Sequence, residues 1–373
     1  MTRLTTRTPF LAALGLALGL ALGLLPAASA QTVGYAEFPS VNFFGLSSDG
    51  TWIVGNNGET AMRYLTTSET TTLLTGAPQA WEVSDSGLVV AGDLKLTPST
   101  RQAARHTLFT GWTPLESIPG VVPPAIYDSR TSGMSRNGTV IVGVQRVGTS
   151  TGNDTNAAFR WTITAGTQAL NVPATAISSS AFCVSGDGLV ASGSIDDPFT
   201  GSSFRSVVLW DADGDWEELL PEPPGSSGQA AVYRLNHDGS KAAGVDWDDN
   251  AFLWEDGSMT VLPEPPGFPE TSWMQPTTMS DDGTVIAGRS LSYTVDNFRG
   301  GWIWTAATGT QWLEDVVEQI GASATPADFA FQYVDGMTPD GTRLIGRSSA
   351  GNGSFYSWIL DLPPGGIGNW IDR

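Results

Sequence analysis

Seven short segments of the chain share one pattern of apolar and polar positions. Each has an apolar residue, then Ser, Thr or Asn, then any residue, then Asp, Asn or Ser, then Gly, and finally an aliphatic run that ends in a second Gly. The seven copies are LSSDGTWIVG, VSDSGLVVAG, MSRNGTVIVG, VSGDGLVASG, LNHDGSKAAG, MSDDGTVIAG and MTPDGTRLIG. An Asp-Gly or Asn-Gly step tolerates the positive φ of a tight turn, and the aliphatic residues around it favour strands. Each segment therefore predicts a β-hairpin.

A second apolar pattern follows each hairpin at a variable distance, and most copies end in an aromatic residue. Examples are AFRW at 158–161, AFLW at 251–254 and FYSW at 355–358. The copy in the second repeat, AARH at 103–106, has Ala and His in place of Phe and Trp. A turn and a short final strand come next, so each unit reads as four antiparallel strands, called a to d in chain order. We expect the aromatic residues of strand c to be buried between neighbouring units.

The spacing of the hairpins indicates a ring of blades. The turn glycines are about 49 residues apart on average, which is typical of the four-stranded blades of a β-propeller. The predicted fold class is all-β: a seven-bladed β-propeller of four-stranded antiparallel blades, in a single domain over residues 31–363. The last unit lacks a clear strand d, and VGYAEFPS begins at Val33 with no strand before it. We expect residues 33–38 to supply that outer strand and close the ring, which removes an exposed sheet edge.

The first thirty residues have the pattern of a secretory signal peptide. Two arginines precede a run of sixteen apolar residues, Phe10–Leu25, and the small residues Ala-Ser-Ala end at Ala30, so cleavage is expected before Gln31. A retained membrane anchor is the alternative, but it needs roughly 18–20 apolar residues. No further membrane span is predicted, and residues 364–373 form a short C-terminal tail.

The charge balance disfavours several kinds of partner. Without the two arginines of the signal, the 18 basic residues fall to 16 against 38 acidic residues, a net charge of −22. Nucleic acid and anionic membrane surfaces carry the same sign of charge, so neither is an expected partner. Cys183 is the only cysteine, so stability must come from a core without disulfides. A secreted monomer, extracellular or periplasmic, is expected.

One repeat carries a resemblance to a known family. NAFLWEDGSMTVLP, residues 250–263, resembles the repeat of the probable extracellular HAF-repeat proteins, in which His-Ala-Phe is followed by an aliphatic residue, an aromatic residue, Gly and Met. Asn250 stands where that family has His, and only Ala251 and Phe252 of the name motif remain. The resemblance covers nearly the whole chain after residue 30. It implies export and β-repeat character, and it lends no catalytic residue.

Binding residues are expected on the face that carries the b–c loops and the d–a connections. These segments vary in length and composition, whereas the a–b and c–d turns are uniform. Aromatic residues that enter strand a could stack on sugar rings, and acidic loop residues could accept hydrogen bonds from sugar hydroxyl groups. The candidate ligand-binding residues are Trp81, Tyr127, Tyr233, Trp273, Asp246 and Asp248. The alternative is that the aromatic residues pack beneath the connections and the acidic residues are merely solvated.

The segment DADGDWEELLPE has acidic residues at the spacing of a calcium-binding loop. The candidate metal ligands are Asp211, Asp213, Asp215, Glu217 and Glu222. The sixth position of such a loop requires Gly for a sharp turn, but Trp216 stands there. The segment also aligns with the c–d turn of the other units. A plain turn is therefore favoured over a calcium site, and no other cofactor is expected.

The sequence favours a secreted non-enzymatic binding or surface-interaction module for an extracellular polysaccharide or another cell-surface component. No catalytic motif supports an enzyme, since His106 occupies an aromatic position of strand c and His237 lies in an a–b turn. Two alternatives remain open. One is an extracellular carbohydrate-active enzyme that uses paired loop carboxylates, which predicts a carboxyl group with a raised pKa at the channel mouth. The other is a structural component of the envelope or matrix.

Overall fold

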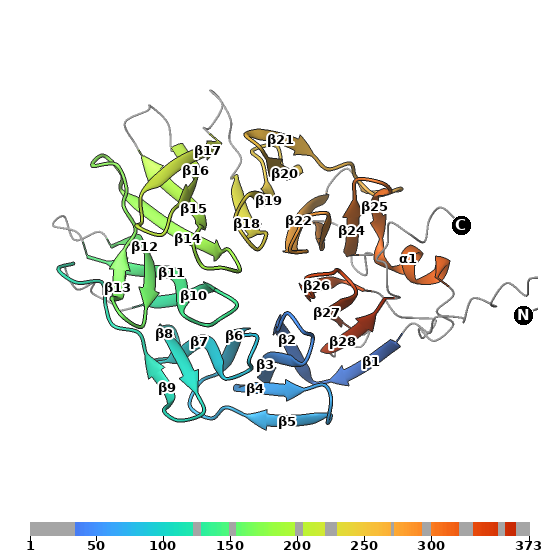
Figure 1. The fold of residues 1–373 in the computed structure, drawn as a ribbon, viewed down its shortest axis with the longest axis horizontal. Coiled ribbons are helices and arrows are strands. Elements are labelled where there is room, and N and C mark those ends of the chain that lie inside the picture. The colour runs from blue at the N-terminus through green and yellow to red at the C-terminus, as the bar shows by residue number, and fades with distance from the viewer. Residues whose placement is uncertain are drawn as a thin grey trace, which may run out of the picture. The chain divides into compact units, whose positions relative to one another are not determined.

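The computed structural model describes residues 34–121, 128–148, 154–197, 204–220, 230–269, 272–292, 300–320, 331–349 and 355–362. The predicted signal peptide and C-terminal tail lie outside these residues. Within the compact unit Thr32–Arg373, the strands form seven four-stranded antiparallel sheets arranged as blades around a central channel (Figure 1). The predicted seven-bladed β-propeller is confirmed.

Blades 1 to 4 follow one another along the chain, each with strand a nearest the channel and strand d outermost. Blade 1 contains β2 (Val41–Leu46), β3 (Trp52–Asn57), β4 (Thr60–Leu65) and β5 (Thr70–Leu73). Blade 2 contains β6 (Gln79–Val83), β7 (Val89–Lys95), β8 (Arg101–Thr107) and β9 (Gly111–Pro114). Blade 3 contains β10 (Ser129–Met134), β11 (Val140–Val147), β12 (Thr155–Thr162) and β13 (Gly166–Ala169). Blade 4 contains β14 (Ser178–Val184), β15 (Ala191–Asp197), β16 (Phe204–Trp210) and β17 (Trp216–Leu220).

Blades 5 to 7 complete the ring. Blade 5 contains β18 (Ala231–Leu235), β19 (Lys241–Val245), β20 (Ala251–Glu255) and β21 (Ser258–Val261). Blade 6 contains β22 (Ser272–Met279), β23 (Val285–Ser292), β24 (Gly301–Thr305) and β25 (Gly309–Trp312), followed by the helix α1 (Leu313–Gln319). Blade 7 contains β26 (Tyr333–Met337), β27 (Arg343–Ser349), β28 (Phe355–Asp361) and, as its outer strand, β1 (Gly34–Pro39). The expected closure by the N-terminal strand is confirmed, since Gly34 pairs with Asp361 and Pro39 with Tyr356.

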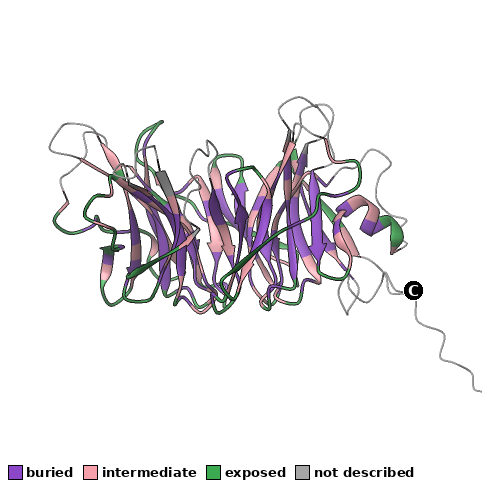
Figure 2. Cartoon of the chain, turned by 90° about the horizontal axis from the view of Figure 1, so that it is seen from above, coloured by how far each residue is buried: buried purple, intermediate pink, exposed green. Residues whose placement is uncertain are grey.

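The repeated polar residues shape the a–b turns, as blade 6 illustrates. The Ser280 hydroxyl donates to the Asp282 carboxylate at 2.7 Å and accepts the Val285 N–H at 3.0 Å. Gly283 follows with φ of 68°, which a side chain would disfavour. In the ring as a whole, buried residues follow the strands and exposed residues lie largely at the connections (Figure 2).

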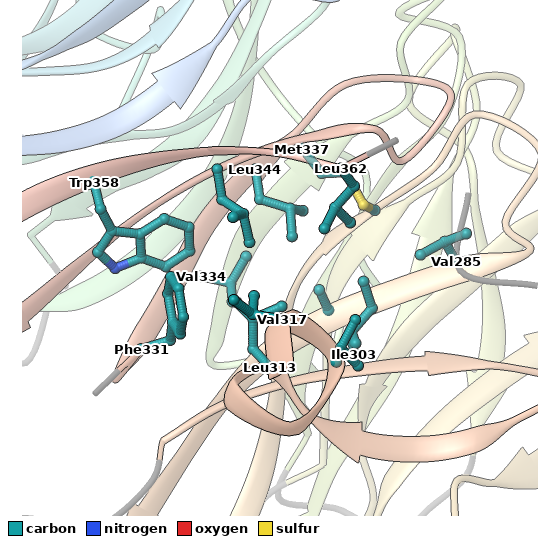
Figure 3. Close-up of a cluster of buried hydrophobic side chains, with 13 residues drawn as sticks. Val285, Ile303, Leu313, Val317, Phe331, Val334, Met337, Leu344, Trp358 and Leu362 are labelled. Atoms are coloured by element: carbon teal, nitrogen blue, oxygen red, sulfur yellow. The ribbon is translucent and has the colours of Figure 1, made fainter. Parts of the chain in front are cut away.

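Large side chains of strand c fill the space between blades, as the sequence predicts. The fully buried tryptophans are Trp210, Trp302 and Trp358. One alignment needs correction: Trp358 pairs with Gly346, which is the position of Phe159 in blade 3 and not that of Trp161. Figure 3 shows Trp358 beside Phe331, with residues of α1 in the same cluster.

In blade 2, which lacks aromatic residues of this kind in strand c, a side chain from another strand fills the space. Ala104 pairs with Gly92, where blades 3, 5, 6 and 7 have Phe or Trp. The ring of Trp112, from strand d, packs over Gly92 instead, and its indole N–H donates to the Leu74 carbonyl oxygen at 3.0 Å. A tryptophan from the outer strand thus replaces the missing one.

Candidate functional site

Strand a of every blade lines the central channel and carries one β-bulge at the same level of the repeat. The bulge residues are Phe44, Trp81, Ser132, Phe182, Tyr233, Thr277 and Asp335. All seven are partly exposed. A bulge redirects a side chain out of the regular alternation of a strand. The bulges therefore set one ring of residues at the wall of the channel.

The second Gly of the repeated motif lies directly against the bulge of strand a. Gly193 pairs with Ala181, the residue just before the bulge of blade 4. A Cβ atom on Gly193 would collide with the carbonyl oxygen of Ser180, and the equivalent glycine of each other blade meets strand a in the same way. The motif requires Gly at its end because the bulged backbone of strand a passes too close for any side chain.

Aromatic and arginine side chains join across the blades into a stack that we call the collar. Its members are Trp81, Phe44, Arg347, Tyr333, Arg289, Tyr233 and Phe182. The rings of Trp81 and Phe44 have centroids 4.7 Å apart. The guanidinium carbon of Arg347 lies 4.7 Å from the Phe44 centroid and 5.3 Å from that of Tyr333. Arg289 lies 5.5 Å from the Tyr333 centroid, so cations and rings alternate over blades 1, 7 and 6.

Blades 4 and 5 extend the collar, and blade 3 interrupts it. The centroids of Phe182 and Tyr233 are 6.1 Å apart, and Tyr233 is close enough to Arg289 to affect its pKa. Blade 3 has Ser132 at the bulge. The collar therefore draws on six of the seven blades, with its gap at Ser132.

Asp93, on strand b of blade 2, supports Trp81 of the collar. Its carboxylate accepts the Trp81 indole N–H at 2.8 Å and the Thr131 backbone N–H at 3.0 Å. Burial raises the pKa of Asp93 to about 6, although both hydrogen bonds oppose the shift. Since Asp93 is buried, it acts as a support that orients Trp81.

Arg289 and Arg347 occupy the same position of strand b in blades 6 and 7, but their partners differ. Arg347 donates from Nε and Nη2 to both oxygens of Asp335, each at 2.8 Å. Burial lowers the pKa of Arg347, but the Asp335 hydrogen bonds outweigh it and the net shift is upward. Arg289 donates from Nε to the neutral Gln275 Oε1 at 2.8 Å, and burial lowers its pKa. The collar thus combines one guanidinium that is paired with a carboxylate and one that forms no ion pair among the described residues.

Below the collar, toward the a–b turns, the channel contains a cavity of about 130 Å³. Glu82 and Arg234 line it at the position after the bulge. The other blades have smaller residues there, namely Gly45, Gly133, Cys183, Thr278 and Gly336. Burial raises the pKa of Glu82 to about 7, with Arg234 opposing the shift. Pockets for small-molecule ligands span about 300–1,000 Å³, so this cavity suits a few water molecules better than a sugar ring.

The a–b turns close the other end of the channel. From blade 2 to blade 7, a backbone N–H of each turn donates to a carbonyl oxygen of the next turn at 2.8–3.3 Å. Pro339 has no N–H to continue the series, and Arg343 of blade 7 donates instead to the Gly50 carbonyl oxygen at 2.8 Å. Arg136 of blade 3 forms a bidentate ion pair with Asp281 of blade 6. This end is a hydrogen-bonded rim with an ion pair between non-adjacent blades.

The predicted aromatic candidates fall in different places. Trp81 and Tyr233 are members of the collar. Trp273 lies in β22 and is partly buried. Tyr127 lies outside the described residues. Two other aromatic residues that enter strand a, Phe43 and Phe331, are fully buried between blades.

The predicted acidic candidates lie in one b–c turn of blade 5. Asp246 is buried, and its carboxylate accepts the backbone N–H groups of Asp248 and Asn250, both at 2.9 Å. Asp248 is exposed. Asp246 therefore shapes the turn, and no described contact joins this pair to the collar.

The predicted calcium loop lies in the turn between β16 and β17. One carboxylate oxygen of Asp211 accepts the N–H groups of Asp213 and Asp215, both at 2.9 Å, as a plain turn requires. Glu217 is exposed on β17, and Glu222 lies outside the described residues. Among the described residues, no three Asp, Glu, His or Cys side chains are placed to hold a metal ion.

Sequence reasoning missed most of the collar. It did not single out Phe44, Tyr333, Arg289 or Arg347, nor did it identify Glu82 in the cavity. An available signal was the final Gly of each motif, which marks a bulge in the strand opposite it. Aligning the seven units on that Gly brings Arg289 and Arg347 to one position, where the other blades have Asn56, Asp93, Val144, Ser194 and Val245.

Comparisons with known proteins support the fold. No family model matches the chain, and no curated protein is similar to it in sequence. An oligogalacturonate lyase from Vibrio parahaemolyticus is similar in structure, with a TM-score of 0.57 and 11% identity over 89% of this chain and 98% of the lyase. An oligogalacturonate lyase in complex with manganese has a TM-score of 0.55 and 11% identity over 89% of this chain and 97% of that one. At this identity the likeness concerns the propeller fold. No helix in the described ranges is long and apolar enough to cross a membrane.

Proposed function

We propose that the protein is an exported binding module that holds a saccharide chain against the collar, at the channel end that carries the b–c loops and d–a connections. The observation that carries the proposal is the collar itself, whose aromatic and arginine side chains are all partly exposed. Aromatic rings offer flat apolar faces to sugar rings, and guanidinium groups donate hydrogen bonds to sugar oxygens. Rings that served packing alone would be buried, as Phe43 and Phe331 are.

Export and family membership belong to the same proposal. The N-terminal signal pattern and the likeness to HAF-repeat proteins both favour a protein that works outside the cytoplasm. The strongly acidic composition suits such a protein and disfavours nucleic acid as a ligand.

The test is retention on polysaccharides together with release of new reducing ends in the same tubes. Purified protein is mixed with a panel of soluble and insoluble polysaccharides, first with calcium and then with EDTA. Oligogalacturonate is included because two similar propellers are lyases of that name. Retention without release supports the binding module. Loss of retention in EDTA would indicate that binding needs a metal ion, for which the acidic turn at Asp211 is the candidate site. Absence of retention on every polysaccharide contradicts the proposal.

A collar variant and a matched control locate the site. Tyr333→Leu removes the ring between the two arginines, and we expect binding to weaken about tenfold, equivalent to ~1.4 kcal/mol. Phe109→Leu removes an aromatic ring that is 94% exposed in a c–d turn, and it should leave binding unchanged. Equal losses in both variants would mean that the collar is not the site.

Glu82 favours a second candidate function, a carbohydrate-active enzyme. A carboxyl group with a pKa of about 7 is suited to donate a proton to a glycosidic oxygen near neutral pH. The small cavity beside Glu82 argues against this candidate. If reducing ends are released and Glu82→Gln abolishes the release, the enzyme replaces the binding module.

A further inference from the structure

Arg289 carries an inference about the ligand of the collar. Three other arginines near the channel form ion pairs with acidic residues: Arg136 with Asp281, Arg347 with Asp335, and Arg130 with Asp128. Arg234, in the cavity, donates instead to the carbonyl oxygens of Thr277 and Tyr233. Arg289 has one polar partner among the described residues, the amide oxygen of Gln275.

The contacts of Arg289 fix its plane and leave its donors available. The bond from Nε to Gln275 holds one edge of the guanidinium, and the Tyr333 ring lies 5.5 Å from its central carbon. Neither terminal nitrogen has a hydrogen-bond partner within the described part of the chain, and the side chain is partly exposed. Four N–H groups in a fixed plane are thus available to a ligand.

The environment favours an anion over a neutral hydroxyl group. A partly buried cation without a direct ion pair is costly: burial lowers the pKa of Arg289, and the nearby Asp335 carboxylate offsets only part of that shift. A ligand carboxylate that binds the two terminal nitrogens side by side supplies a direct partner in the geometry that guanidinium groups prefer. Lysine would offer the positive charge without the two parallel N–H donors of a guanidinium group.

We propose that the collar selects acidic saccharides, with Arg289 binding the carboxylate of a uronic acid residue in the chain. This inference rests on the proposed function, since it names the ligand class of the same site. Arg347 contributes packing to Tyr333 and Phe44, while its charge remains paired with Asp335. Arg289 therefore supplies a local attraction that distinguishes an acidic chain from a neutral one, and this attraction must exceed the repulsion from the net negative charge of the protein.

The experiment compares one chain with and without its charge. Oligogalacturonate of defined length and its methyl ester, which has the same rings but no carboxylates, are titrated into the protein by calorimetry. We expect the acid to bind at least tenfold more tightly than the ester. In Arg289→Gln, affinity for the acid should fall about 10–100-fold, as for a lost hydrogen bond to a charged group, and affinity for the ester should change less than twofold.

Two further variants keep the result interpretable. Arg289→Lys retains the charge but loses the two parallel donors, and it should recover only part of the affinity for the acid. Arg130→Gln removes an exposed arginine on strand a of blade 3, outside the collar, and it should behave as the wild type. Thermal unfolding midpoints are measured for every variant, and Arg289→Lys decides the outcome if Arg289→Gln proves unstable.

The outcomes separate the inference from the proposed function. Equal binding of acid and ester, or an unchanged affinity for the acid in Arg289→Gln, overturns the inference while the binding module stands. Failure of every saccharide, neutral chains included, contradicts the proposed function and the inference with it. Selective loss of acid binding in Arg289→Gln supports both.

Discussion

The two ends of the channel are built from the same repeated strand a, yet they differ in chemistry. At the turn end, each blade repeats a Ser, Thr or Asn and a turn Gly, and backbone hydrogen bonds pass from turn to turn whatever the side chain between them. At the collar end, the bulge positions hold Phe, Trp, Ser, Tyr, Thr or Asp. The blades share residues where their turns hold the ring together. They differ where partly exposed side chains face the channel. The difference teaches where to look for function in a propeller of equal blades.

The largest expected effect concerns Glu82, which lies between the two ends. Its pKa is about 7 in the folded protein against an ordinary 4.5. Below pH 4.5 both folded and unfolded states are protonated. Between pH 4.5 and 7 the unfolded state ionises first, so the free energy of unfolding falls as pH rises. Glu82→Gln removes this titration, and we expect it to match the wild type at pH 4 and to exceed it by about 2–3 kcal/mol at pH 8.

Urea unfolding at the two pH values measures this effect. Glu59→Gln, at an exposed position of blade 1, serves as the control and should not alter the pH profile. A gain in Glu82→Gln that is the same at pH 4 and pH 8 would assign the effect to packing and sink the electrostatic explanation.

The next effect concerns the turn end. Arg136→Met leaves the Asp281 carboxylate without its partner. Because the two side chains are 26% and 32% exposed, we expect a loss of only about 1–2 kcal/mol, less than for a fully buried pair. The double variant Arg136→Met with Asp281→Leu should recover most of this loss. Urea unfolding of the four proteins measures the cycle, and saccharide retention should be unchanged in all of them. Weakened retention would show that the turn end is not purely structural.

The smallest effect sharpens the picture of the collar end. Ser132 leaves a gap in the collar, so Ser132→Tyr would add an aromatic ring on blade 3, which now contributes none. We expect saccharide affinity to rise a few fold, equivalent to about 0.5–1 kcal/mol. Calorimetry with oligogalacturonate measures the gain, and Ser132→Ala is the control. An affinity that falls in Ser132→Tyr would mean that the ligand passes through the gap itself.

Much of the fold could be predicted because it depends on local pattern. The Asx-Gly turns gave the blade count, and the unpaired VGYAEFPS gave the closing strand. The register of blade 7 could not be read from FYSW, because Trp358 and Trp161 look alike in sequence and only pairing with Gly346 separates them. Trp112 could not be foreseen as the substitute in blade 2, because strand d is exposed in several other blades.

The collar was only partly within reach of the sequence. Trp81 and Tyr233 could be picked out as aromatic residues near the start of strand a. Phe43 and Phe44 are adjacent in the sequence. Only the position of the bulge determines that Phe44 lies at the channel and Phe43 is buried. Arg289 stacks on Tyr333 of the next blade, and such contacts between neighbouring units have no local signature. A repeat alignment that places bulges first would bring these positions into view.

The pairing of β1 with β28 determines when the ring can be completed. The two strands lie about 320 residues apart in the chain, so β1 has no partner until β28 has been made. A chain that crosses a membrane from its N-terminus delivers β1 first and β28 last. In the proposed export, β1 would therefore be an unpaired edge, which favours aggregation until its partner arrives. Glu37 and a final Pro39 on β1 are the kinds of residue that protect such an edge while it waits.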